Sequence, residues 1–490
     1  MMKLKFLIIA VMILMVSRIH SQDIKEPEQP NILFLSINDV NDFVGFLDGR
    51  YKAKTPSMDE IAARGVNFTN AHCTTPSCGP SRNAILFGQH SFNSGLYRYN
   101  QEMQEVQKEI RKKTPEFISL PQMLKENGYD TYASGEIHCY DWTYTHMDGK
   151  VEWTGHHIPN QKEMKPVKDL GHSFAGKNDW KFYPTSNEDS DYQSHDVVNY
   201  GIEILEMKHE SPFFLALGLY ECHLPLMTPK KYFDLYTELE IAPTYFEDLD
   251  DIPPVGIKFT NNGNDNKIIQ QAGKWELVIQ SYLATLSFID NQVGRILTAL
   301  ENSEYHKNTI VILWSDHGNH YGSKSKLTKF TLWEGATHVP LVIWDLREDA
   351  PRGRVCAEST SLVDLYPTIM TMTGLTPPNY LDGVDLTPWL ENPALSREIP
   401  PIITMGRGNY AIRTKDWRYI KYYDGSEELY HNAVDKLEIK NLANIDEYQA
   451  QKREMIKWLP KDEAPLNDIN AGAMIFHDAD HDNMKRTNHQ

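Results

Sequence analysis

Three short, almost uninterrupted apolar runs limit what this chain can fold into. They span residues 31–37, 212–219 and 309–314. Strands of a parallel sheet that is covered by helices on both faces have this pattern. The first run ends at Asn38-Asp39 and the last at Ser315-Asp316-His317. Ligands of open α/β sheets bind beyond the carboxyl ends of the strands. The runs therefore predict an α/β sheet with a binding site at one edge.

Helices are expected between these strands. One should begin at Thr55-Pro56, because Thr suits the N-cap and Pro the first turn, and it should end at Gly65. Further helices are predicted over residues 119–127, 275–300 and 361–374, and a further strand over residues 129–134. This alternation of strands and helices is typical of an α/β domain.

The pattern changes after Pro377-Pro378. Short alternating strands are predicted over residues 402–405, 410–413, 417–422 and 429–430, followed by a helix over about residues 446–458. A chain of 490 residues is long for one domain. We therefore expect a large domain over residues 22–378 and a smaller one over residues 379–490.

The first residues have the features of an export signal. Residues 1–21 contain Lys3 and Lys5, an apolar run over 6–16, and Ser21 at a plausible cleavage point. The run is too short to span a bilayer comfortably. We therefore predict a signal peptide over residues 1–21, a secreted or periplasmic protein, and no membrane span. The formal charge of −18 argues against a nucleic-acid partner.

The most specific motif lies in residues 73–88, which read CTTPSCGPSRNAILFG. Cys78 stands at a turn that opens a helix, where backbone N–H groups favour an anion, and Pro80 suits the first helical turn. Taken alone, such a cysteine would usually be an ordinary buried thiol. The run Cys78-Gly79-Pro80-Ser81-Arg82 with Leu86-Phe87-Gly88, however, resembles the signature of the type I sulfatases.

Other segments resemble the same family. Residues 54–59 and 223–236 are similar to its iduronate-2-sulfatase-like branch, and residues 411–420 resemble its C-terminal antiparallel sheet. The resemblance implies an alkaline-phosphatase-like α/β/α sandwich with a mixed central sheet, plus a smaller C-terminal α+β domain with an antiparallel sheet. It covers nearly the whole chain after the predicted signal peptide.

The resemblance also implies cofactors. A maturation enzyme would convert Cys78 to formylglycine (3-oxoalanine), whose aldehyde hydrate is the nucleophile of the family. One Ca²⁺ would be bound by the side chains at five positions, namely Asn38, Asp39, Cys78, Asp316 and His317.

Further side chains would bind substrate and move protons. By resemblance, Arg82 holds the formylglycine turn, His138 orients its hydroxyls and contacts sulfate, and His223 protonates the leaving oxygen. Lys329 would bind sulfate, with Lys326 and Lys324 as further candidates. These lysines would give an acidic protein a local basic lining for an anionic substrate.

Two positions depart from the family pattern. Asn38 stands where the family has an acidic calcium ligand, and an amide oxygen binds a hard cation without adding charge. Glu136 stands where the family has a sulfate-binding lysine. An anion there should raise the free-energy cost of binding sulfate, unless another lysine compensates or Glu136 points away.

The chain has an odd number of cysteines, so one thiol is left over if the others pair. The five are Cys73, Cys78, Cys139, Cys222 and Cys356. Conversion of Cys78 would remove that thiol from the count. The remaining four cysteines could form two disulfides or stay reduced.

The predicted function is that of an exported sulfatase, which hydrolyses sulfate esters on a sulfated polysaccharide or oligosaccharide. One alternative is a phosphate or phosphonate ester hydrolase, because the alkaline phosphatase superfamily shares this fold. A second alternative, suggested by Asn38 and Glu136, is a sulfated-glycan-binding protein with impaired catalysis.

Overall fold

The computed structural model describes residues 29–97, 116–139, 149–240 and 249–464. The predicted signal peptide, residues 1–21, lies outside these ranges. No helix among the described residues is long and apolar enough to cross a membrane.

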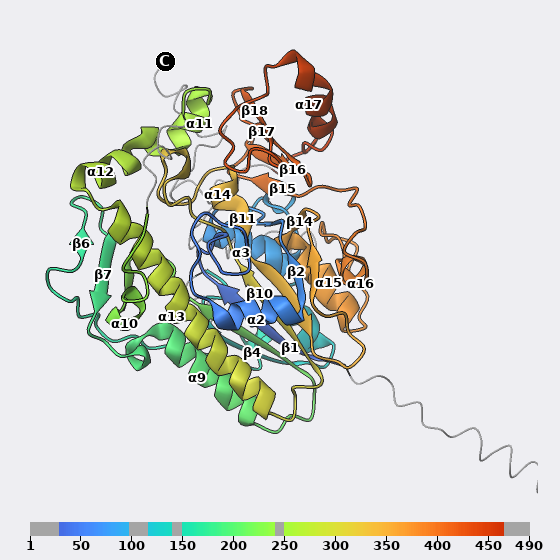
Figure 1. The fold of residues 1–490 in the computed structure, drawn as a ribbon. Helices are drawn as coiled ribbons and strands as arrows, with labels where there is room; N and C mark the ends of the chain where they lie inside the picture. Colours follow the sequence, from blue (N-terminus) through green and yellow to red (C-terminus); the bar gives the residue numbers. More distant parts are fainter. Residues whose placement is uncertain (1–28, 98–115, 140–148, 241–248, 465–490) are drawn as a thin grey trace, which may run out of the picture.

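A mixed sheet of eight strands runs through the centre of the described structure (Figure 1). Its strand order is β13-β2-β12-β10-β1-β8-β4-β5. The strands β10, β1, β8, β4 and β5 are parallel to one another, and β12 is antiparallel to β10. The bounds are β1 Asn31–Ile37, β2 Val66–Phe68, β4 Asp130–Gly135, β5 Gly155–His157, β8 Phe213–Leu219, β10 Thr309–Ser315, β12 Leu341–Asp345 and β13 Arg354–Cys356.

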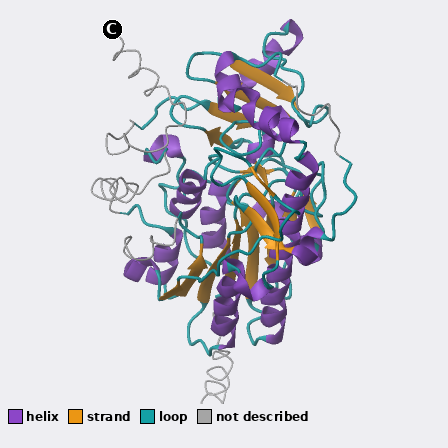
Figure 2. Cartoon of the chain, turned by 90° about the vertical axis from the view of Figure 1, so that its left-hand side faces the viewer, coloured by secondary structure: helices purple, strands orange, loops and turns teal. Residues whose placement is uncertain are grey.

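Helices cover both faces of this sheet (Figure 2). On one face α2, α9 and α13 pack against the strands, and α3, α6 and α15 lie on the other face. Strand β1 shows how the sequence serves both layers: Leu33 and Leu35 join the first core, whereas Ile32 and Phe34 join the second. Burying each such side chain contributes about 1.5–3 kcal/mol. The predicted strand buried on both faces is confirmed.

The helices have the following bounds: α2 Pro56–Arg64, α3 Cys78–Phe87, α4 Ser91–Ser94, α6 Leu120–Glu126, α8 Gly149–Glu152, α9 Gln193–Glu206, α10 Lys230–Phe233, α11 Pro254–Phe259, α12 Asn264–Ala272, α13 Trp275–Asn302, α14 Glu334–Thr337, α15 Leu365–Met372, α16 Thr387–Glu391 and α17 Gln449–Ile456. Helix α2 begins at Pro56, as expected, but the predicted cap is wrong. The Thr55 side chain makes no capping hydrogen bond, and Asp290 of α13 accepts the N–H groups of Ser57 and Met58 instead.

A smaller antiparallel sheet, β15-β16-β17-β18, lies at one end of the molecule, where Figure 1 shows it beside α17. Its strands are β15 Ile402–Thr404, β16 Tyr410–Arg413, β17 Trp417–Lys421 and β18 Glu427–His431. Two further sheets have the orders β11-β3-β14 and β6-β7-β9. Their strands are β3 Ala71–His72, β6 His172–Ser173, β7 Lys181–Thr185, β9 Leu226–Pro229, β11 His338–Val339 and β14 Thr360–Ser361.

Candidate active site

The carboxyl ends of four adjacent parallel strands bring the predicted residues to one edge of the central sheet. Asn38 and Asp39 follow β1, Asp316 and His317 follow β10, and His223 follows β8. Glu136 and His138 follow β4, and α3 contributes Cys78 and Arg82. All residues of α3 are buried, because its apolar side packs into the second core.

Four of these residues form a compact buried cluster: Asp39, Cys78, Asp316 and His317. One ligand atom from each lies within 4.8 Å of the others. The Cys78 Sγ atom is 3.1 Å from His317 Nε2 and 3.8 Å from Asp39 Oδ1. Asp39 has a left-handed backbone with φ of 59°, which is uncommon for a residue other than glycine and is enriched at functional sites.

Lys329 supplies a cation to this cluster. Its Nζ atom lies 2.8 Å from Asp39 Oδ1 and 3.1 Å from Cys78 Sγ. Burial acts to lower the pKa of Lys329, but Asp39 and Cys78 outweigh it, so the pKa is raised and the side chain is charged. Burial likewise acts to raise the pKa of Asp39, but Lys329, His223 and His317 hold that pKa below its ordinary value.

The environment of Cys78 favours an anion at this position. A hydrogen bond with Cys139 does most to hold the pKa of the Cys78 thiol well below its ordinary value. Burial opposes this shift, and Lys329 and His317 add to it. The group at position 78 is therefore surrounded by side chains that stabilise negative charge.

Arg82 bonds to residues at the carboxyl ends of three strands, β1, β4 and β10. Its Nε atom donates to Asp316 Oδ2 at 3.0 Å, and its Nη2 atom donates to Asn38 Oδ1 at 3.1 Å. The Nη1 atom donates to Ser36 Oγ at 2.8 Å and to the backbone carbonyl of Glu136. Because an arginine with several fixed acceptors cannot move freely, Arg82 holds α3 against the sheet.

Two histidines lie at this edge in different surroundings. His138 Nε2 is 2.9 Å from Glu152 Oε2, and both side chains are buried. His223 has its Nδ1 atom 2.7 Å from the carbonyl oxygen of Leu224 and forms a hydrogen bond with Cys78. Burial and Lys329 act to lower the pKa of His223, but Asp39 and Cys78 raise it to about 9.

Glu136, which departs from the family pattern, points inward. Its Oε2 atom accepts a hydrogen bond of 2.9 Å from Asn38 Nδ2. Burial raises its pKa to about 7, against the opposing effect of Arg82. Of the alternatives left open for Glu136, the one in which its side chain points away from the site is therefore excluded.

The other predicted lysines lie elsewhere. Lys326 Nζ is 3.4 Å from Asp265 Oδ2, and Lys324 Nζ donates to the backbone carbonyl of Glu438. Only Lys329 among the three contacts the Cys78 cluster. The five cysteines are all reduced and buried, so neither disulfide is formed.

The donor set of the cluster fits a hard divalent cation once Cys78 is converted. Carboxylate and amide oxygens are the ligands that Ca²⁺ prefers, and Asp39, Asp316 and Asn38 offer them. Formylglycine would replace the sulfur of Cys78 by oxygen, leaving His317 as the one nitrogen donor of the set.

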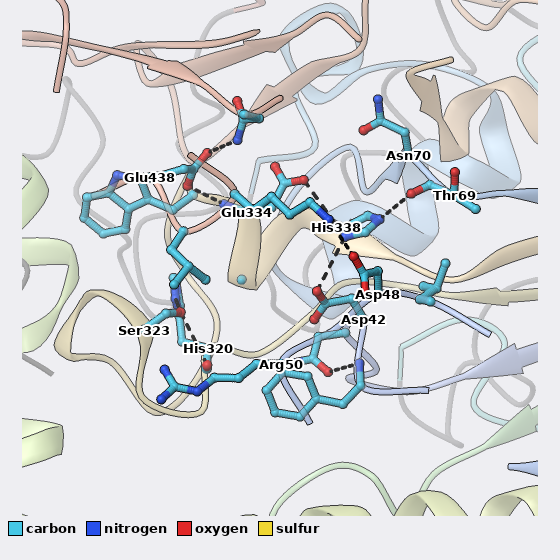
Figure 3. A pocket seen from close by; sticks show the side chains of 18 of the residues that line it. Asp42, Asp48, Arg50, Thr69, Asn70, His320, Ser323, Glu334, His338 and Glu438 are labelled. Atoms are coloured by element: carbon cyan, nitrogen blue, oxygen red, sulfur yellow. Dashed lines mark hydrogen bonds and ion pairs between the residues drawn. The ribbon is translucent and has the colours of Figure 1, made fainter. Parts of the chain in front are cut away.

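A cavity of about 900 Å³ lies between the segment after β1 and the smaller sheet. Figure 3 shows His338 among Asp42, Glu334 and Thr69 in this cavity. The Nε2 atom of His338 is 3.0 Å from the Thr69 carbonyl oxygen. Of the site residues predicted from the sequence, all of which the structure describes, Lys324 alone lines this cavity.

Comparisons with known proteins identify the family. The sulfatase family model matches residues 30–375. A protein named sulfatase from Formosa agariphila is 34% identical, over 90% of this chain and 88% of its own length. The chain belongs to the sulfatase family. It is therefore a sulfuric ester hydrolase, and the resemblance noted in the sequence is confirmed.

More distant relatives of this sulfatase have named substrates. An ulvan-active sulfatase from Formosa agariphila is 25% identical, over 92% of this chain and 84% of the relative. Human iduronate 2-sulfatase is 27% identical, over 71% of this chain and 70% of the relative. A solved 2-O GAG sulfatase has a TM-score of 0.64 at 22% identity and covers 88% of this chain and 91% of its own. This last likeness confirms the predicted fold.

Sequence reasoning did not identify three residues of this site: Glu152, Cys139 as the partner of Cys78, and Tyr220. The Tyr220 hydroxyl lies 3.3 Å from His223 Nδ1. The only available signal was proximity in sequence, because Cys139 follows His138 and Tyr220 precedes His223 by three residues. Glu152 has no such signal.

Proposed function

We propose that this sulfatase is an exported enzyme that removes sulfate from a sulfated polysaccharide or oligosaccharide, using formylglycine made from Cys78 and one calcium ion. The observation that carries the proposal is the contact of Cys78 with Lys329 and His317 beside two buried carboxylates. These groups combine a nucleophile position, an anion-binding cation and a metal-ligand set.

Two groups supply the difficult chemistry. Asp39, Asp316, His317 and Asn38 would hold the calcium ion, which would supply Lewis-acid stabilisation of negative charge. Position 78 would hold the formylglycine, which would supply the nucleophilic oxygen for covalent catalysis.

The side chains around position 78 bind, orient and move protons. Lys329 holds a sulfate oxygen, since its Nζ atom already lies 3.1 Å from Cys78 Sγ. Arg82 fixes the start of α3 through Asp316 and Asn38. His223, whose pKa is raised to about 9, carries the proton that the departing alcohol takes up.

His138 serves as a second contact to the hydroxyls at position 78. Its Nε2 atom is 2.9 Å from Glu152 Oε2, which orients the ring and fixes which nitrogen faces the site. Lys326 is paired with Asp265, so it is not assigned a contact with sulfate.

The substrate class is supported by two relatives. One is described as ulvan-active and the other as an iduronate 2-sulfatase. We propose a sulfated glycan that contains uronic acid as the substrate of this chain, in line with the iduronate in the name of the second relative. Export is supported by the pattern of residues 1–21. The same pattern supports a secreted or periplasmic location. A domain division near residue 378 is supported by the separate antiparallel sheet β15-β16-β17-β18 that follows it.

The alternative of a phosphate or phosphonate ester hydrolase predicts a different substrate preference. The discriminating experiment compares 4-nitrophenyl sulfate with 4-nitrophenyl phosphate, using protein in which conversion of Cys78 is verified by peptide mass. We expect a higher kcat/KM for the sulfate ester, lost in Cys78→Ala and retained in Cys356→Ala, which removes another buried thiol.

A preference for the phosphate ester would refute the proposal. Binding of sulfated glycans without release of sulfate by converted protein would favour the impaired binding protein instead.

A further inference from the structure

The backbone of Glu136 is fixed at the end of β4. Its N–H donates to the carbonyl oxygen of Gly218 at 3.2 Å, and its own carbonyl accepts from Arg82 Nη1. A Cβ atom on Gly218 would lie 2.3 Å from the Glu136 carbonyl oxygen, so β4 and β8 meet there without a side chain between them. The backbone from which the Glu136 side chain extends is therefore fixed by the sheet.

The Glu136 carboxylate is held inside the protein by polar partners. Its Oε2 atom accepts from Asn38 Nδ2 at 2.9 Å, and its Oε1 atom accepts from Cys139 Sγ at 3.6 Å. The residue is only 6% exposed. A buried carboxylate is costly unless hydrogen bonds or opposite charges compensate it. The cost of burying the Glu136 carboxylate beside the Cys78 cluster suggests that it has a function in the site.

Arg82 and Glu136 hold the amide of Asn38 between them. Arg82 has only donors, so the Asn38 oxygen must face Arg82, and the Asn38 nitrogen then donates to Glu136. The Nε and Nη2 atoms share one edge of the guanidinium plane, and they hold Asp316 Oδ2 and Asn38 Oδ1, respectively. The Asn38 oxygen thus lies next to an oxygen of the metal-ligand cluster.

The net charge of the site also bears on how Glu136 affects a bound metal ion. With Cys78 converted, the negative Glu152 beside His138 and a protonated His223 offset each other in the described site. The remaining charges are two cations, Arg82 and Lys329, and the carboxylates of Asp39, Asp316 and Glu136. A divalent ion turns this excess of one negative charge into one positive charge, which suits a sulfate ester. Without Glu136 the residues would be neutral before the ion binds and would attract it less.

We propose that Glu136 is a positioning residue for the metal ion, supplying the third negative charge of the site and holding the amide oxygen of Asn38 toward the cluster. The inference rests on the proposed function, since it needs calcium among Asp39, Asp316 and His317. Partners that orient metal ligands commonly affect metal affinity 10- to 100-fold.

Isothermal titration of calcium into converted, chelator-treated full-length protein tests this role. Glu136→Gln keeps the size and an acceptor for Asn38 but removes the charge, so we expect the calcium Kd to rise about tenfold. Glu427→Gln is the control, because Glu427 lies in the smaller sheet and accepts hydrogen bonds from Tyr419 and Lys452. Its calcium Kd should equal that of the wild type.

A double substitution separates this role from simple damage to the fold. Glu136→Lys alone should weaken calcium binding more than Glu136→Gln, because it puts a cation beside Arg82. Adding Asn38→Asp moves the carboxylate to the neighbouring position and should return the Kd to within about threefold of the wild type. A purely structural role for Glu136 would make the two changes additive.

The outcomes distinguish the two proposals. If the wild type binds no calcium, the proposed calcium-dependent function fails together with this inference. If the wild type binds calcium and Glu136→Gln binds it equally well, only the inference is overturned. Because Glu136→Gln is nearly isosteric, it remains informative even if Glu136→Lys does not fold. Failure of Asn38→Asp to rescue a folded Glu136→Lys protein would also overturn the inference.

Discussion

His223 has a fixed ring orientation beside Cys78. The Leu224 carbonyl is 2.7 Å from Nδ1 and can only accept a hydrogen bond, so Nδ1 carries a proton and Nε2 is the nitrogen available to a substrate. Asp39 and Cys78 raise the pKa of His223 to about 9, despite burial and Lys329. A raised pKa favours the protonated ring that a general acid needs.

We expect His223→Ala to affect sugar sulfates far more than activated aryl sulfates. A sugar alkoxide is a poor leaving group that needs a proton, whereas 4-nitrophenolate leaves without one. The kcat/KM should fall about 10²- to 10⁴-fold for a sulfated oligosaccharide and far less for 4-nitrophenyl sulfate. His306→Ala, a half-buried histidine after α13, should change neither value. Equal losses on both substrates would contradict the general-acid role.

Several contacts of individual residues could not be predicted from the sequence. The pairing of His138 with Glu152, and of Lys326 with Asp265, joins segments whose mutual placement depends on tertiary packing. The family pattern gave a lysine position at 136, but it could not tell whether a glutamate there would turn inward. The Asn38 contact decides that orientation.

The strands of the central sheet were predictable because strands buried on both faces consist almost entirely of apolar residues. The continuous apolar run of β1 reflects burial on both faces, and the polar residues that follow it mark the edge of the sheet. The strand order was not predicted from the sequence. Pairing of Asn31 with Thr309 joins positions far apart in the sequence, and no local pattern specifies it.

Helix α2 shows how a distant element can replace a local signal. The Thr55 hydroxyl, which the sequence suggested as a cap, donates to Asp59 Oδ1 at 2.9 Å. The carboxylate of Asp290 accepts from Ser57 N at 3.1 Å and Met58 N at 2.8 Å. The first turn of α2 is thereby attached to α13.

Asp290→Ala should therefore lower the free energy of unfolding by about 0.5–2 kcal/mol, the usual cost of losing a helix cap. Urea unfolding followed by circular dichroism measures the change. Asn291→Ala, at the exposed next position of the same helix, should shift the free energy by no more than about 0.5 kcal/mol. An Asp290→Ala protein as stable as the wild type would show that α2 needs no such cap.

At the scale of the whole molecule, the smaller sheet supports the segment that carries Lys329. Arg418 of β17 donates to the Leu332 carbonyl at 2.8 Å, and Trp333 Nε1 donates to Glu428 Oε2 at 2.7 Å. Arg418 is fully buried and also pairs with Glu438 at 2.6 Å and with Glu334. The two sheets are thus joined through buried charge close to the active site.

Arg418→Met should destabilise the protein by about 3–5 kcal/mol at neutral pH, because it leaves buried carboxylates without their partner. Arg413 and Arg418 hold the pKa of Glu334 well below its ordinary value, although burial opposes this. This stabilisation is present above the ordinary carboxylate pKa and is lost as pH falls toward the lowered one. The difference between variant and wild type should therefore shrink below about pH 4.

Urea unfolding at neutral and acidic pH tests this expectation. Arg64→Met is the matched control: Arg64 is half exposed, pairs with Glu60 and Glu301, and should contribute about 1 kcal/mol or less. A pH-independent effect of Arg418→Met would indicate lost packing and not lost ion pairing.

The central claim is that Cys78 and its neighbours release sulfate from a sulfated glycan. The most direct measurement is free sulfate liberated from a panel of sulfated polysaccharides and their oligosaccharides, uronic-acid-containing glycans included. The protein should come from a host that makes formylglycine, with conversion of Cys78 verified by peptide mass. The account predicts sulfate release from at least one uronic-acid-containing glycan and none from Cys78→Ala. Release by the Cys78→Ala protein, or no release from any glycan by fully converted wild type, would contradict it.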